Sequence, residues 1–211
     1  MRKSKILSIK GHEFLNFLIS NKIFILLTIL LLLGICFGAL FIDKRIPFIY
    51  DYAHNRFTQL FFLKSFDSNF LKITFSSLFA SLIFLVLIFL GGTSFVGILF
   101  APSVFLLKAI SYGCVAAYIY ATYGLKGIAL NALVFIPYNL ISFIGLIFAT
   151  NEAILFSYDL ARIAMPRGYT VSLFASFKSY CKKFAVAFLL IIFSALTDAF
   201  CSSVFIRFFN L

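Results

Sequence analysis

The chain has 211 residues, of which 63% are hydrophobic and 12% carry a charge, and its formal net charge is +11. Soluble domains have roughly 45 to 50% apolar and about 25% charged residues, so the composition excludes an ordinary soluble protein. It indicates an all-α polytopic membrane helix bundle, a single integral domain over residues 1–211. No basic stripe with interleaved aromatic residues marks a nucleic-acid module, so we expect membrane lipids to be the partners of the positive charge.

The first apolar run covers residues 23–42 and is 20 residues long. As a helix it measures about 30 Å, one hydrocarbon thickness. A cleavable signal has a core of about 7 to 15 apolar residues, so we expect a retained helix. Gly34 and Gly38 form a GxxxG pair, which either allows another helix to approach closely or is a chance spacing in a membrane helix.

Residues 43–72 mix charges with Phe and Tyr, and Pro47 discourages continuation of the first helix. We expect this segment to lie along the membrane surface and to contain a short amphipathic interfacial helix. Helical spacing in it joins Phe57, Leu60, Phe61 and Lys64.

Two further runs follow at 73–92 and 95–121, separated by Gly91–Gly92–Thr93–Ser94. Pro102 predicts a kink or a discontinuous helix in the second of them. Lys108 comes just after that proline, and placing a charge at membrane depth costs about 2.5 to 3.5 kcal/mol on insertion scales. The position therefore requires a partner or water.

A polar link at 122–127 precedes a run at 128–150, and helical character continues to about 164. Pro137 removes a backbone donor inside this run. The freed groups must be satisfied by protein or water, and Asn131 and Asn139 are the candidates. Two interpretations remain: a kink satisfied by its own amides, and a substrate site.

The fifth expected span, 184–206, contains Asp198. Basic residues near helix ends gather before the first span and between the fourth and fifth, which the positive-inside rule makes cytoplasmic. We therefore expect a multi-pass protein of the bacterial plasma membrane with its N-terminus in the cytoplasm and its C-terminus outside. These basic residues are Arg2, Lys3, Lys5, Lys10 and Lys22, then Arg162, Arg167, Lys178, Lys182 and Lys183; the predicted outer segment also holds Lys44, Arg45, Arg56, Lys64 and Lys72.

Asp198 and Glu152 are the two acids that could pair with Lys108. A buried ion pair is the first hypothesis, since loss of one partner would leave a charge costing about 3 to 5 kcal/mol. A proton or ion relay through the acids, or Lys108 snorkelling to a cleft, are alternatives. No hydrolase, zinc-protease or nucleotide-binding motif occurs, so we expect no enzyme, and no catalytic, cofactor or metal site.

The ordered motifs resemble the stage II sporulation protein M family of integral membrane proteins with about five helices. They are LGICFG in the first span, SFDSNFLK before the second, LLKAISYG around Lys108, FIPYNLI around Pro137, FSYDLARI, and SALTDAF in the last span. The resemblance implies a non-enzymatic scaffold or anchor that assembles peptidoglycan hydrolases at the septal membrane during engulfment. Its implied partners are similar to stage II sporulation proteins D and P, a lytic transglycosylase and an amidase/endopeptidase.

The second hypothesis is a small transporter or permease component, as an oligomer or with a separate ATPase. Its motivation is the intramembrane set of Lys108, Glu152 and Asp198 together with the break at Pro137. For the scaffold, the candidate contact surfaces are the GxxxG face and the outer segment 43–72.

Overall fold

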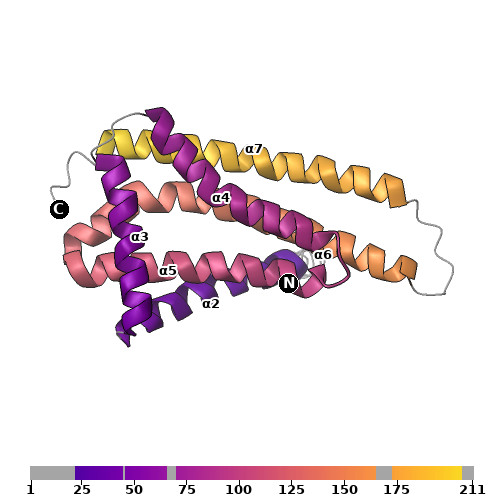
Figure 1. The fold of residues 1–211 in the computed structure, drawn as a ribbon, viewed down its shortest axis with the longest axis horizontal. Helices are drawn as coiled ribbons and strands as arrows, with labels where there is room; N and C mark the ends of the chain where they lie inside the picture. The colour runs from indigo at the N-terminus through magenta and orange to yellow at the C-terminus, as the bar shows by residue number, and fades with distance from the viewer. Residues whose placement is uncertain (1–21, 45, 66–69, 165–172, 206–211) are drawn as a thin grey trace, which may run out of the picture.

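The computed structural model describes residues 22–44, 46–65, 70–164 and 173–205, and within these ranges the chain is helical, without a strand. The helices pack lengthwise into a bundle, with one helix lying across it (Figure 1). The predicted helix end at Met165–Pro166–Arg167–Gly168, the basic residues before Lys22, and Arg45 lie outside the described residues. In chain order the elements are α2 (Lys22–Asp43), α3 (Pro47–Ser65), α4 (Phe70–Gly92), α5 (Gly97–Leu130), the π-helical turn η1 (Asn131–Phe135), α6 (Ile136–Ala164) and α7 (Leu173–Phe205).

Four helical stretches are long and apolar enough to cross a bilayer: Lys22–Asp43, Phe70–Gly92, Gly97–Ile163 and Leu173–Phe205. Large apolar side chains such as Leu32, Phe79 and Leu189 are exposed along these helices, each with about 60% of its surface accessible or slightly more. A soluble protein would bury such side chains, whereas lipid solvates them. The architecture is that of a multi-pass membrane helix bundle.

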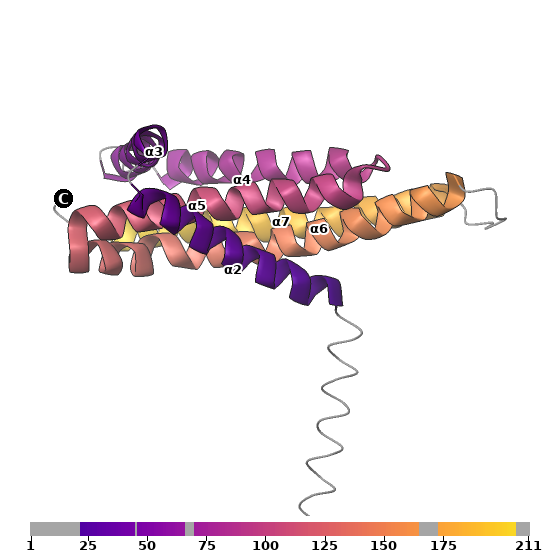
Figure 2. The same cartoon turned by 90° about the horizontal axis from the view of Figure 1, so that it is seen from below.

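The 67-residue stretch Gly97–Ile163 reverses direction inside α5, at Gly124. Gly124 has φ 54° and ψ −129°, and the helix runs back beside itself from that point (Figure 2). Only glycine adopts such angles without strain, because it has no Cβ. The reversal falls within the predicted polar link at 122–127 and turns one helical stretch into two antiparallel arms.

Gly124→Ala is expected to destabilise the protein by about 1 to 3 kcal/mol, the cost of holding a side chain in a sparsely populated backbone region. Nothing lies within 4 Å of a Cβ built at this glycine, so the effect isolates backbone strain from crowding. Thermal unfolding in detergent, followed by circular dichroism, measures the change. Leu125→Ala, at a residue 85% exposed, is the control and should leave stability nearly unchanged. Equal melting temperatures for the two variants would contradict backbone strain at position 124.

The last two long helices extend beyond the others. α7 begins at Leu173, whereas the apolar run that predicted it begins at Phe184, because lysines lower hydropathy but are good helix formers. Its 33 residues measure about 50 Å, well above the roughly 30 Å needed to cross the hydrocarbon. The pair of α6 (153–164) and α7 (173–183), called the stalk below, projects past the ends of the other helices in Figure 1, and its base contacts α4, where Tyr180 Oη donates to the Phe89 carbonyl at 2.9 Å.

Of the two alternatives predicted at Pro102, a kink or a discontinuous helix, the discontinuous helix is wrong. α5 keeps helical backbone angles throughout except at Gly124. Pro102 is the sixth residue of α5, so its missing N–H removes a single hydrogen bond close to the helix start. The irregular turn lies instead at η1, directly before Pro137.

α3 lies across the long helices in Figure 1 and appears nearly end-on in Figure 2, where the others run lengthwise. α3 (Pro47–Ser65) lies within the segment 43–72, in which the sequence predicts a short interfacial helix. Ala53 and Phe57 form its buried face, and Phe57 packs against the rings of Tyr118, Tyr123 and Phe135. Hydrogen bonds between Tyr52 and Ser111 (2.9 Å) and between His54 and Tyr118 (2.7 Å) also tie it to α5.

Candidate functional site

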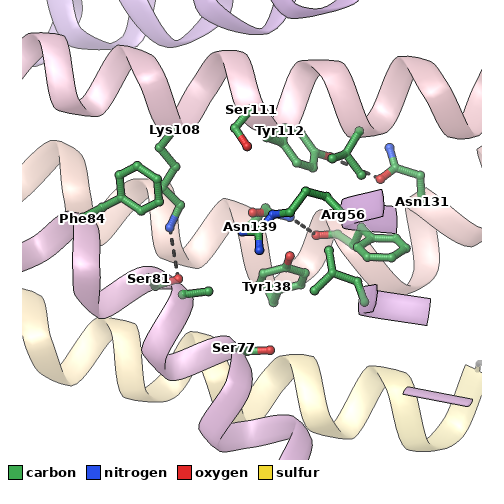
Figure 3. Close-up of a pocket in the computed structure, with 14 residues that line it drawn as sticks. Arg56, Ser77, Ser81, Phe84, Lys108, Ser111, Tyr112, Asn131, Tyr138 and Asn139 are labelled. Carbon is green, nitrogen blue, oxygen red and sulfur yellow. Dashed lines mark hydrogen bonds between the residues drawn. The ribbon is translucent and has the colours of Figure 1, made fainter. Parts of the chain in front are cut away.

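Lys108 is 92% buried, with 8% of its surface exposed, and its ammonium group is bound by two hydroxyls. Nζ donates to Ser81 Oγ of α4 at 3.0 Å and to Ser142 Oγ of α6 at 2.7 Å, and the two hydroxyls lie 3.2 Å apart. Figure 3 shows the lysine side chain reaching Ser81 beside the ring of Phe84. The lysine therefore joins three helices in the middle of the bundle.

Two aromatic rings complete the surroundings of this ammonium. Nζ lies 5.4 Å from the centroid of Phe84 and 5.8 Å from that of Phe143. An ammonium within about 6 Å of a ring face gains about 0.5 to 2 kcal/mol from the ring quadrupole. Hydroxyls and rings reduce the cost of burying the charge without neutralising it.

The two acids expected to pair with Lys108 have other partners. Asp198 is fully buried in α7 and accepts a hydrogen bond from Ser77 of α4. Glu152 accepts from Lys183 Nζ at 2.7 Å, an ion pair that links α6 to α7 at the base of the stalk. Among the described residues Lys108 forms no ion pair with either acid, so the expected buried pair is absent. The hydroxyl dipoles of Ser81 and Ser142, in place of an opposite charge, offset the loss of hydration of the Lys108 ammonium.

The irregular turn before Pro137 is satisfied by the chain's own amides. The Asn139 side chain donates to the Phe135 carbonyl at 2.9 Å, within the turn where the ordinary ladder is interrupted. The Asn131 amide donates to Tyr120 Oη, and its oxygen faces Tyr112 Oη at 3.5 Å. This geometry favours the first of the two interpretations of Pro137. A π-helical turn is nevertheless frequent at functional sites.

A polar cavity of about 80 Å³ lies between α3, α4, α5 and α6. One water occupies on the order of 10 to 15 Å³ by the same measure, so several waters fit. Six of its polar lining residues are Arg56, Ser81, Lys108, Ser111, Asn131 and Asn139 (Figure 3). Three intramembrane candidates from the sequence, Lys108, Asn131 and Asn139, are thus brought together, whereas Asp198 and Glu152 are not among the lining residues.

Sequence reasoning missed the serines and Arg56. Ser77 and Ser81 stand four residues apart and therefore on one face of α4, a polar stripe that the sequence does display. Ser142 follows Asn139 by three residues on the same face of α6. Arg56 could be assigned only to the surface, because nothing in the sequence places α3 against this cavity.

No protein-family profile, curated protein or solved structure matches the chain. The site is therefore interpreted from its own chemistry. Among the described residues no three His, Cys, Asp or Glu side chains gather as metal ligands. The polar groups that line the cavity, beside apolar side chains such as Leu60 and Val115, can all donate an N–H or O–H, and they suit a polar or anionic occupant.

Proposed function

We propose that the chain is a non-enzymatic scaffold of the bacterial plasma membrane that holds peptidoglycan hydrolases during envelope remodelling, similar to stage II sporulation protein M. The observation that carries the proposal is α3, a helix held crosswise on the bundle with one face uncovered. Phe48 on that face is 83% exposed and Asp51 is exposed beside it. A rigidly mounted helix with an exposed aromatic anchor is suited to binding a partner.

The proposed topology has five crossings, because the stretch Gly97–Ile163 crosses twice around the reversal at Gly124. The N-terminus is cytoplasmic and the C-terminus outside. α3 then lies at the outer surface, where the wall and its hydrolases are, and the stalk projects into the cytoplasm with Lys178, Lys182 and Lys183 on it. The GxxxG face does not serve as a partner surface here, because α5 covers it.

Capture from native membranes tests the scaffold. A tagged chain is crosslinked in cells, and lytic transglycosylases and amidases of the cell wall are quantified by mass spectrometry. Phe48→Glu should reduce their recovery at least fivefold. Phe174→Glu, at a residue 79% exposed on the stalk, is the matched control and should not. Equal recovery with both variants, or no hydrolase with the unaltered chain, would contradict the proposal.

The second candidate is a transporter component, and the observation that favours it is the polar cavity around Lys108. Buried ionisable residues within a membrane bundle often line substrate pathways. Proteoliposomes loaded with acetate, phosphate and potassium separate the two functions. Flux above that of protein-free liposomes, lost in Lys108→Met, would support transport, while hydrolase capture without flux would support the scaffold.

A further inference from the structure

We infer that the polar cavity beneath α3 binds a small oxyanion of the phosphate class, with Lys108 and Arg56 as its counter-charges. The inference stands apart from the proposed function, because a scaffold and a transporter can both hold such an anion. Its starting point is the Lys108 ammonium, which is buried at 8% exposure and has only neutral oxygen partners among the described residues. A buried cation with no compensating anion is unfavourable, and a bound anion removes that cost.

The ammonium has one donor left for a ligand. A lysine side chain carries three N–H groups, and Lys108 uses two of them on Ser81 and Ser142. Ser81 and Lys108 line the cavity together, so the bond between them holds the amine at its wall. The third N–H is available to an oxygen that enters the cavity.

Arg56 adds a second cation to the cavity lining, and unlike Lys108 it is exposed. It is exposed on α3, yet it lines the same cavity as the buried lysine (Figure 3). A guanidinium presents a planar set of donors that matches two oxygens of a phosphate or carboxylate. The site therefore has a buried inner cation, Lys108, and an exposed outer cation, Arg56.

Other polar residues of the lining supply donors as well, beside apolar ones such as Leu60 and Val115. Ser111, Tyr112 and Asn131 contribute hydroxyl and amide groups, and no carboxylate is among the lining residues. Asp198 lies outside the lining and accepts from Ser77. A volume of about 80 Å³ admits several waters or one phosphate group, but not a large organic solute. Anions reach such a site either as free phosphate or as the headgroup of an anionic lipid.

Two arms of one experiment distinguish these sources. In the first, the full-length protein in neutral detergent is titrated with inorganic phosphate against chloride at matched ionic strength, and the melting temperature is followed. A ligand that binds only the folded state raises this temperature. In the second, nanodiscs of phosphatidylcholine with phosphatidylglycerol are analysed by native mass spectrometry for retained phosphatidylglycerol. A shift in the first arm alone assigns a free anion, and retention in the second assigns a lipid phosphate.

Three variants test whether the anion binds in the cavity. Lys108→Met should weaken binding at least tenfold, Arg56→Gln by a smaller factor, and Lys126→Gln, at an exposed lysine near the helix reversal, should have no effect. Arg56 is exposed, so its variant keeps the test decisive even where Lys108→Met fails to fold. No binding by the unaltered protein in either arm, or equal loss with Arg56→Gln and Lys126→Gln, would overturn the proposal.

Discussion

Removing both serine hydroxyls from the Lys108 ammonium, as Ser81→Ala with Ser142→Ala, should destabilise the protein by about 3 to 6 kcal/mol. A hydrogen bond to a charged group contributes about 1.5 to 3 kcal/mol, and the amine makes two of them. Once both are gone, the buried charge has lost its two direct hydrogen bonds and keeps the rings of Phe84 and Phe143 and the adjoining cavity. Unfolding in mixed micelles by titration with a denaturing detergent measures the loss.

A third substitution distinguishes charge burial from a simple packing defect. Lys108→Met keeps the length of the side chain and removes its charge, so the triple variant should recover most of the stability lost by the double variant. Ser103→Ala, which removes an exposed hydroxyl bonded to its own helix at Leu99, is the control and should have little effect. A triple variant no more stable than the double one would show that the serines act through shape and not through the ammonium.

The positions of the helices follow from the sequence, because apolar runs of membrane length are their own signal. The break in the middle of the chain was also foreseeable from the polar link around Gly124. The full extent of α7 was not, since Lys178, Lys182 and Lys183 end the apolar run but not the helix. Hydropathy reports where lipid begins, and helix propensity reports where the helix begins, and the two differ here.

The candidate site could be predicted only in part. A charged residue in an apolar run singles out Lys108, and a proline in another singles out the turn satisfied by Asn139. The partners of Lys108 could not be predicted from the sequence, because several polar residues in the apolar runs could each bind an ammonium. Rotation and depth of each helix decide between them, and packing sets both. An opposite charge was the natural expectation, and serines took its place.

The two glycines of the GxxxG pair lie where α2 meets α5, and their position leads to a prediction about the sign of an effect. A Cβ at Gly38 would collide with the Ile110 carbonyl and lie 2.8 Å from Cys114 N. At the facing Gly113 it would collide with the Ile35 carbonyl. The obstacles are backbone atoms, which cannot rotate away as a side chain can.

Gly38→Ala should therefore destabilise the protein by about 1 to 3 kcal/mol through overpacking. In an exposed helix the same substitution would stabilise by about 0.8 to 1 kcal/mol, because alanine has the higher helix propensity. The sign of the change in unfolding free energy thus reports whether the two backbones touch. Cys36→Leu, which adds bulk at an exposed position of the same helix, should leave stability nearly unchanged.

Combining Gly38→Ala with Gly113→Ala sharpens the result. Each substitution forces α2 away from α5, so the second has less to displace once the first is present. The double variant should therefore lose less stability than the sum of the two single losses. Full additivity would mean that each glycine is confined by separate surroundings. A stabilising Gly38→Ala would mean that the helices stand apart, which would leave the GxxxG face open to a partner chain.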